Sequence, residues 1–158
     1  MSEIIIRPME VADLSQVEEI DRLSFTSPWH KGAFLAELQA SPSLCWVAEI
    51  SDTHKVAGVI IGWLIEDELQ VATLSVHPDW RKLGIGRRLL AQLLQDSQAK
   101  GAKVAFLEVA ASNQAAQNLY RSFGFKVQGR RKNYYTAEKD DALLMMLERV
   151  EVLEVNGG

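Results

Sequence analysis

Residues 81–90, "RKLGIGRRLL", have the composition of an anion-binding loop. Two glycines, Gly84 and Gly86, lie among basic residues, and an apolar pattern with helical spacing begins at once. Glycines let backbone N–H groups turn inward around an anion, and the N-terminus of the following helix adds partial positive charge. The stretch therefore predicts a binding site for a phosphate or a pyrophosphate, with an ordinary tight turn as the alternative.

Two familiar phosphate-binding loops do not match this stretch. A P-loop needs a lysine and then Ser or Thr after its last glycine, but Arg87 and Arg88 follow Gly86. A dinucleotide-binding fingerprint needs a third glycine at the position where Leu89 stands. The sequence therefore argues against nucleoside triphosphate hydrolysis and against dinucleotide binding.

Glu108 is a second candidate for chemistry, because it is the only charged residue in the apolar run "VAFLEVAA". A carboxylate within a buried strand costs free energy unless it has a role or a partner. Two interpretations stay open on the sequence alone. Glu108 either acts as a general base, or it faces solvent or pairs with a basic residue.

The next helical pattern, "NQAAQNLYRSFG", contains two further polar candidates. Asn113 stands at its start, which predicts an N-cap. Tyr120 shares a helix face with Ala116 and Phe123, which predicts a core tyrosine whose hydroxyl needs a hydrogen-bond partner. His77 precedes Pro78 at the entrance of the glycine loop, where we expect a structural role rather than that of a base.

The elements that must position these residues alternate along the chain, with no repeats or linkers. Helical spacing and strand-like apolar runs predict the following order. We expect strands at 3–8, 43–50, 55–65, 68–76, 103–111, 125–135 and 141–150, and helices at 10–25, 31–40, 85–99 and 113–124. This order predicts a mixed α/β or α+β sheet with helices on its faces, and a parallel pair within 68–109. We expect one domain over residues 1–150 and a flexible tail at 151–158.

Bulk composition limits the classes of protein that the chain can be. Its 158 residues suit one domain with a full core. The net charge of -4 argues against a general nucleic-acid binder. The opening "MSEIIIRPMEVADL" lacks a signal-peptide pattern, and no apolar run approaches the roughly 20 residues that span a bilayer. We therefore expect a cytoplasmic protein with neither nucleic acid nor membrane as a partner.

The cysteine and the histidines do not suggest a metal site. Cys45 stands alone, which excludes an internal disulfide and a cysteine metal cluster, and we expect a small buried hydrophobe. No metal-ligand spacing links His30, His54 and His77. We therefore expect no metal.

Several motifs together resemble one known family. The stretch "VHPDWRKLGIGRRLL" resembles the acetyl-CoA pyrophosphate loop of the GNAT acetyltransferases. "LEVAASNQAAQNLYRSFGF", "RRKNYY", "DALLMML" and "FTSPWHKGAF" are similar to parts of the N-terminal protein acetyltransferases within that family. The resemblance covers residues 3–148. It implies a GNAT fold, with a mostly antiparallel sheet, one parallel splayed pair and helices on both faces.

The resemblance also implies acetyl-CoA as a cosubstrate and assigns residues to it. In the family, the backbone of the strand before the loop pairs with the cofactor arm and supplies N–H groups to an oxyanion site. The loop binds the pyrophosphate, and an asparagine at the start of a later helix contacts the cofactor arm. The matching residues here are Leu74, Ser75, Val76, Arg81, Lys82, Leu83, Gly84, Ile85, Gly86, Arg87 and Asn113.

The same resemblance assigns catalytic residues and residues that bind the acceptor peptide. It implies that Glu108 is the base, often acting through water, and that Tyr120 donates a proton to the leaving thiolate. Tyr134 and Tyr135 resemble a tyrosine pair that lines the peptide groove. Strand alternation puts them on opposite faces, so we expect one to pack and the other to line the groove. Phe25 and Trp29 are expected in the opposite wall.

An α-amine is the easier acceptor, because its pKa is about 8 against about 10.4 for lysine. The resemblance implies an enzyme that acetylates the α-amine of a protein, namely a ribosomal protein beginning with alanine. We expect a monomer or weak dimer. Two alternatives stay open. One is a lysine or small-amine acetyltransferase, and the other is a non-catalytic acetyl-CoA sensor.

Overall fold

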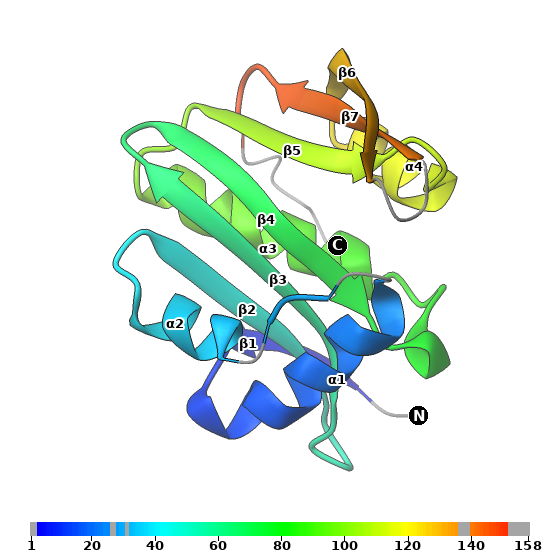
Figure 1. Cartoon of the computed structure of the whole chain (residues 1–158). Helices are drawn as coiled ribbons and strands as arrows, with labels where there is room; N and C mark the ends of the chain where they lie inside the picture. The colour runs from blue at the N-terminus through cyan, green and yellow to red at the C-terminus, as the bar shows by residue number, and fades with distance from the viewer. Residues whose placement is uncertain (1–2, 26–27, 31, 136–139, 152–158) are drawn as a thin grey trace. The chain divides into compact units, whose positions relative to one another are not determined.

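A computed structural model describes residues 3–25, 28–30, 32–135 and 140–151. Its strands form one mixed sheet in the order β1-β2-β3-β4-β5-β7-β6. The strands are β1 Ile4–Pro8, β2 Ser43–Ile50, β3 Val56–Ile65, β4 Glu68–Val76, β5 Val104–Ala110, β6 Lys126–Tyr135 and β7 Asp140–Leu147. The helices are α1 Leu14–Ser24, α2 Ala33–Gln39, α3 Ile85–Ala99 and α4 Gln114–Ser122. The predicted mixed sheet with helices is confirmed (Figure 1).

The parallel pair predicted around the 68–109 crossover is also confirmed. β4 and β5 run parallel, with pairs from Glu68↔Val104 to Val71↔Leu107. The other recorded strand pairs are antiparallel. β4 continues to Val76, and the glycine loop follows it in the chain. The strand that pairs in parallel with β5 therefore also leads into this loop.

Two predicted helices start later than their apolar patterns suggest. A 3-10 turn at Val11–Asp13 precedes α1, because the Asp13 carboxylate accepts the Glu10 N–H at 2.8 Å and caps the start. α2 begins at Ala33, because Gly32 has a φ of 89° and so cannot continue a right-handed helix.

The chain forms two compact units. Unit 1 contains Met1–Trp63 and Ala72–Leu93, and unit 2 contains Leu64–Val71 and Leu94–Gly158. The organisation of residues 1–150 as one domain stays a prediction. No helix in the described ranges is both long and apolar enough to span a bilayer.

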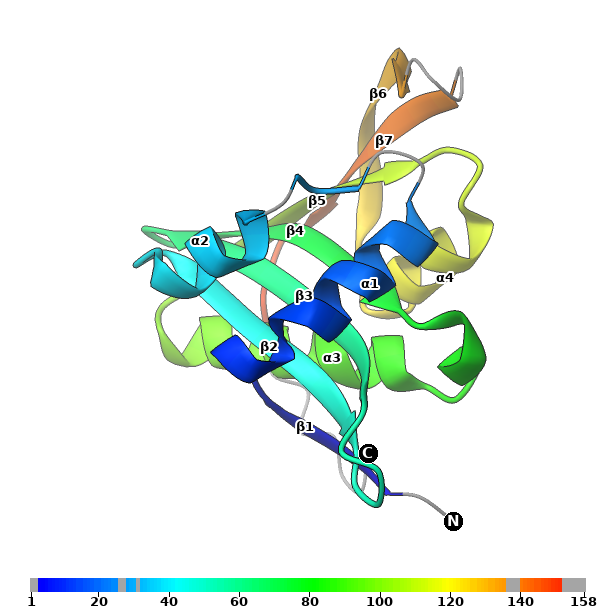
Figure 2. The same ribbon diagram turned by 60° about the horizontal axis from the view of Figure 1, so that its bottom comes forward.

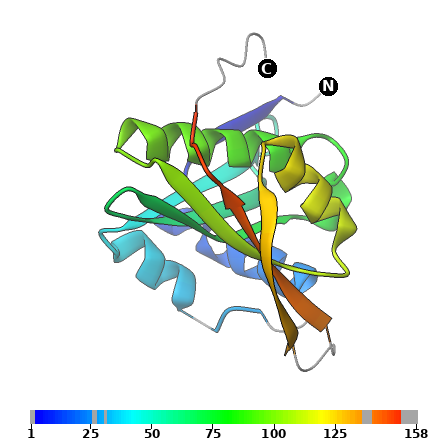
Figure 3. The same ribbon diagram turned by 90° about the horizontal axis from the view of Figure 1, so that it is seen from above.

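Unit 1 is a helix–sheet–helix sandwich. Figures 2 and 3 show α1 and α2 on one face of β2 and β3, with the first turns of α3 on the other face. On the α1 face, the core contains Val17, Ile20, Phe34, Val47, Val59 and Ile61. Cys45 packs against this cluster, and burial raises the pKa of its thiol to about 12, together with the negative charge of Glu37. The expected role of Cys45 as a small buried hydrophobe is confirmed in part, because Cys45 packs against the core but is only half-buried.

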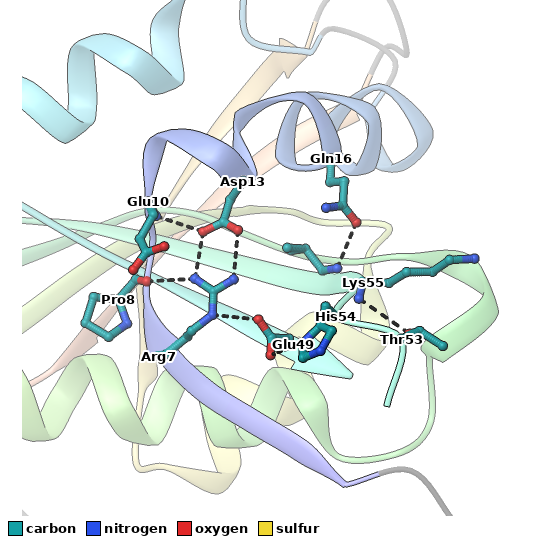
Figure 4. A network of polar contacts seen from close by, with 10 residues as sticks. Arg7, Pro8, Glu10, Asp13, Gln16, Glu49, Thr53, His54 and Lys55 are labelled. Atoms are coloured by element: carbon teal, nitrogen blue, oxygen red, sulfur yellow. Dashed lines mark hydrogen bonds and ion pairs between the residues drawn. The ribbon is translucent and has the colours of Figure 1, made fainter. Parts of the chain in front are cut away.

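A polar network fixes the first strand of unit 1 to the start of α1 (Figure 4). Arg7 donates from Nη1 and Nη2 to the two carboxylate oxygens of Asp13, each at 2.8 Å. Its Nε donates to Glu49 Oε1 at 2.9 Å. The Val56 N–H donates to Gln16 Oε1 at 2.9 Å, which joins α1 to β3. These contacts set the position of α1 on the sheet.

Unit 2 is built on the strands β5, β7 and β6, in that order, with α4 following β5 (Figure 3). Leu107 and Met145 are paired across β5 and β7, and both are fully buried. Gln117 of α4 donates to the carbonyls of Ala110 and Ala111, at 3.2 and 2.8 Å. The C-terminal end of β5 is therefore tied to α4.

Candidate active site

In unit 1, the segment after β4 is held by His77 and by a short 3-10 turn at Pro78–Trp80. The His77 N–H donates to the Ala57 carbonyl at 2.7 Å. His77 Nδ1 accepts the Asp79 N–H at 3.1 Å. This cap is the structural role expected for His77, and it gives the glycine loop a fixed starting point.

The backbone of the glycine loop turns at two positions. Lys82 and Gly84 have φ angles of 66° and 80°, both left-handed. α3 begins at Ile85, and the Arg88 N–H donates to the Gly84 carbonyl at 3.1 Å. The N–H groups of the first helical turn have no acceptor within the helix and lie at its partially positive end. The loop can therefore present several N–H groups to one anion.

Arg81 braces this loop. Its Nε donates to the Val76 carbonyl at 2.9 Å, and its Nη2 donates to Ser24 Oγ at 3.4 Å. The loop is thereby connected to the end of β4 and to the end of α1. Lys82 and Arg87 are exposed, so these two side chains supply positive charge around the N-terminus of α3.

The other predicted cofactor residues of unit 1 differ in exposure. Leu83 is exposed, Gly86 is half-buried and Ile85 is buried. On β4, Leu74 and Val76 are half-buried, whereas Ser75 is buried. Ser75 Oγ has no hydrogen-bond partner among the described residues. Because its side chain points into packed structure, Ser75 can offer a ligand only its backbone groups.

Glu108 lies on β5 in unit 2 with its side chain 26% exposed. Its Oε1 is 3.6 Å from Nη1 of Arg131, a β6 residue whose side chain is 62% exposed. Of the interpretations left open by the sequence, the structure shows the pairing with a basic residue. At this exposure, a substrate or a water molecule can reach the Glu108 carboxylate.

Arg131 also contacts one tyrosine of the predicted pair. Its Cζ lies 5.3 Å from the centroid of the Tyr134 ring, and Tyr134 is 47% exposed. The Tyr135 side chain lies outside the described atoms, so the expected split between a packed tyrosine and a groove tyrosine stays a prediction. Unit 2 thus brings together Glu108, Arg131 and Tyr134.

Tyr120 and Asn113 occupy the places in α4 that their helix pattern predicts. Tyr120 is 7% exposed, and its ring centroid lies 5.8 Å from that of Phe125 at an interplanar angle of 60°. The expected core position is confirmed. Asn113 Oδ1 accepts the Ala116 N–H at 3.1 Å, which confirms the N-cap.

Phe25 and Trp29, the other two residues expected to bind the acceptor, lie in unit 1. Phe25 follows α1 and is exposed. Trp29 stacks on Phe34 with ring centroids 4.7 Å apart. The backbone N–H of Trp29 donates to Asp21 Oδ2 at 2.6 Å. Trp29 is therefore partly a core residue, with its backbone anchored to α1.

A model of the acetyltransferase (GNAT) family matches residues 14–125. The chain belongs to this family. Membership confirms the expected fold and the expected enzyme class, an acetyl-CoA-dependent N-acetyltransferase.

Named relatives of this acetyltransferase match it over most of their length. The N-alpha-acetyltransferase RimI of Mycobacterium tuberculosis is 38% identical over 147 residues, covering 90% of each chain. The ribosomal protein bS18-alanine N-acetyltransferase of Escherichia coli is 33% identical over 144 residues, covering 90% of this chain and 95% of the relative. A crystal structure of the Escherichia coli ribosomal-protein-S18-alanine N-acetyltransferase superposes with a TM-score of 0.85 at 31% identity, covering 98% of both chains.

The sequence of the acetyltransferase predicts a role for neither Arg131 nor Asp21. The only signal for Arg131 is its place in the basic run before the tyrosine pair, "GRRKNYY". Asp21 has the helical position of a buried residue, but nothing in its neighbours marks a buried carboxylate. No group of three or more His, Cys, Asp or Glu that could hold a metal occurs within the described ranges.

Proposed function

We propose that this acetyltransferase moves an acetyl group from acetyl-CoA to the α-amine of a protein N-terminus, and that its substrate is the N-terminal alanine of ribosomal protein bS18. The relatives named for this substrate are similar over nearly the whole chain. The observation that carries the proposal is Glu108, an accessible carboxylate on β5 that can accept a proton from an amine.

The cofactor site would use the backbone of the glycine loop in unit 1. Acetyl-CoA, when bound, supplies an acetyl thioester and a pyrophosphate. The left-handed turns at Lys82 and Gly84 and the N-terminus of α3 fit a pyrophosphate, because they concentrate N–H donors and positive charge. Leu83, Ile85, Gly86 and Arg87 complete this loop, while Arg81 holds its shape.

The strand before the loop would bind the rest of the cofactor. Leu74, Ser75 and Val76 follow the last recorded pair of the β4–β5 ladder, at Val71. Their backbone N–H groups are the proposed donors to the reacting carbonyl oxygen, where a positioned donor stabilises developing negative charge. Asn113 would add a polar contact from the start of α4, alongside its role as N-cap.

Proton transfer would use Glu108 and Tyr120 of unit 2. The amine nitrogen forms a bond to the thioester carbonyl carbon, and Glu108 takes the proton that the nitrogen loses, directly or through water. The carbon–sulfur bond breaks, and Tyr120 Oη gives its proton to the departing sulfur. Proton exchange with solvent then restores both side chains. Each group contributes by being positioned and in the required protonation state.

Acceptor binding would use aromatic side chains. Tyr134 and Tyr135 are proposed to contact the backbone of the incoming peptide, and Phe25 and Trp29 to contact its first side chain. The exposure of Tyr134 and Phe25 agrees with this role, because a ring that binds a peptide must be accessible before the peptide arrives.

Two peptides test the acceptor. One begins with alanine, has a free terminus and contains no lysine. The other has a blocked terminus and one internal lysine in an otherwise identical sequence. We expect thiol release and an acetylated product, identified by mass spectrometry, with the first peptide only. Acetylation of the lysine peptide alone would reject the α-amine assignment. Acetyl-CoA binding without acetylation of either peptide would favour a small-amine substrate or a sensor.

Two variants test the chemistry with the first peptide. Glu108→Gln and Tyr120→Phe should each lower kcat by about 100-fold or more, because general acids and bases contribute 10²–10⁴-fold. Tyr120→Phe keeps the ring that packs on Phe125, so the variant should still fold, which a thermal unfolding curve checks. Full activity of either variant would remove that residue from the mechanism.

A further inference from the structure

Arg131 contacts both Glu108 and Tyr134. Its Nη1 lies 3.6 Å from Glu108 Oε1, and its Cζ lies 5.3 Å from the Tyr134 ring centroid. We propose that Arg131 is a positioning residue, whose guanidinium aims the Glu108 carboxylate at the acceptor amine and holds the Tyr134 ring for the peptide. This inference rests on the proposed function of Glu108 and Tyr134.

The strand register of unit 2 puts the two charged side chains on one face of the sheet. β7 lies between β5 and β6. Glu108 pairs with Leu144 of β7, and Leu144 pairs with Gly129 of β6. Arg131, two residues beyond Gly129, pairs with Ala142 of β7. Paired residues and residues two apart project to the same side, so Arg131 and Glu108 share a face.

Only a long side chain can join these two strands. Neighbouring strands lie about 4.8 Å apart, so about 10 Å of sheet separates β6 from β5. On this face β7 presents Ala142, which has only a methyl group, beside Arg131, and Leu144 beside Glu108. The arginine side chain therefore crosses β7 next to Ala142 and alongside Leu144.

Tyr134 lies next to the same guanidinium, within an irregular part of β6. In a regular strand, Arg131 and Tyr134 would face opposite sides, since they are an odd number of residues apart. A register shift is present between Arg131 and Tyr135, so regular alternation does not fix the side on which Tyr134 lies. The ring lies within cation–π distance of the guanidinium.

The length of the ion pair favours positioning over tight binding. At 3.6 Å, the Nη1–Oε1 distance is longer than a hydrogen bond. Ion pairs between accessible side chains are weak, so Arg131 attracts the carboxylate without holding it in one fixed position. This attraction acts on Oε1, and Oε2 is left to accept the proton of the amine or of a bridging water.

Steady-state kinetics with the free-terminus alanine peptide test this role. Arg131→Met should lower kcat about tenfold, because a small misplacement of a catalytic group costs up to about 100-fold. It should also raise the peptide KM about threefold, as expected from loss of a cation–π contact. Arg131→Lys should recover kcat to within about threefold but leave the peptide KM raised, because an ammonium does not replace a stacked guanidinium. The KM for acetyl-CoA should not change.

Tyr134 separates the two effects. Tyr134→Leu should raise the peptide KM by more than Arg131→Met does, because it removes the proposed peptide contact as well as the Arg131 contact. Added to Tyr134→Leu, Arg131→Met should raise the peptide KM no further, because the ring that Arg131 holds is already absent.

Arg130 supplies a matched control. It is the neighbouring arginine of β6, and its Nε pairs with Asp141 instead. Arg130→Met removes the same charge and should leave kcat and the peptide KM within about twofold of the wild type. Equal losses in both Met variants, or wild-type kinetics in Arg131→Met, would overturn the inference. If Glu108→Gln is inactive while Arg131→Met is unaffected, the Arg131 inference fails alone; if Glu108→Gln is fully active, the proposed function fails as well.

Discussion

The backbone N–H of Trp29 donates a 2.6 Å hydrogen bond to Oδ2 of Asp21, a carboxylate that is 1% exposed. The other oxygen, Oδ1, has no hydrogen-bond partner among the described residues. Burial raises the pKa of Asp21, although the Trp29 N–H and the positive charge of Arg22 act in the opposite direction. The Trp29 backbone is therefore anchored to α1 by a carboxylate that is held at an energetic cost when it is charged.

The difference in stability between the wild type and Asp21→Asn should depend on pH, because Asp21 titrates and asparagine does not. With its pKa raised in the folded state, Asp21 stabilises the fold most below its unfolded value, about 3.9, and this contribution is lost as pH rises through the folded value. Asparagine does not titrate and keeps an oxygen for the Trp29 N–H. The difference in free energy of unfolding should shift in favour of Asp21→Asn between pH 3 and pH 7, measured by urea unfolding.

Asp21→Ala is the control, because it removes the acceptor as well as the charge. We expect it to be less stable than Asp21→Asn by about 1–3 kcal/mol at pH 7, since it leaves a backbone donor without its partner. A parallel pH dependence of Asp21→Asn and the wild type would contradict the assignment.

The Arg7–Asp13 pair should have the opposite pH dependence. Burial by itself would raise the pKa of Asp13, but hydrogen bonds from Arg7 and from the Glu10 backbone, with the charge of Arg7, lower it below its usual value. Such a carboxylate stabilises the fold above its unfolded pKa, about 3.9, and loses this contribution as pH falls through the folded value. Arg7→Met should therefore cost about 2–3 kcal/mol at pH 7 and progressively less under acid conditions.

Arg149→Met is a suitable comparison for Arg7→Met. Arg149 also forms an ion pair, with Glu151 at 3.4 Å, but both side chains are exposed. Its loss should change the free energy of unfolding by less than about 0.5 kcal/mol. Chemical denaturation of Arg7→Met and Arg149→Met at several pH values checks this prediction. Equal, pH-independent losses of free energy of unfolding in the two variants would refute it.

Gly58 permits the close packing of β3 against α3. A Cβ there would meet Leu89 Cδ1 at 3.0 Å, Ile85 Cγ2 at 3.1 Å and the Ser75 carbonyl at 3.2 Å. Gly58→Ala should therefore destabilise the protein by about 1–3 kcal/mol through overpacking. At Gly129 the nearest atom would be 3.9 Å away, so Gly129→Ala should cost nothing measurable by thermal unfolding. A neutral Gly58→Ala would show that α3 can move away.

Gly84 and Gly101 separate the function of the glycine loop from backbone strain. Both have left-handed φ angles, 80° and 105°, and neither has an atom within 4 Å of an added Cβ. Alanine at either position should cost about 1 kcal/mol of stability. Only Gly84→Ala should weaken acetyl-CoA binding, by about tenfold in calorimetric titration, because only it shifts the proposed pyrophosphate donors. Equal acetyl-CoA affinity of the two variants would argue against the loop as the cofactor site.

Features that depend on residues close together in the chain could be predicted from the sequence. The Asn113 cap, the helix start after Gly84 and the core position of Tyr120 follow from local backbone preferences and helix periodicity. The parallel β4–β5 pair follows from the strand–helix–strand order, since such crossovers return in the same direction. Local chemistry and topology rules were therefore sufficient to predict the parallel direction of β4 and β5 and the start of the helix after the glycine loop.

Relationships across strands were decided only by the tertiary structure. Glu108 and Arg131 meet because β7, a later segment, pairs between β5 and β6, and because the register puts both side chains on one face. A shift of one residue in either ladder would turn one of them to the other side of the sheet. The sequence by itself shows an isolated glutamate and a basic run, and only the strand register makes them partners.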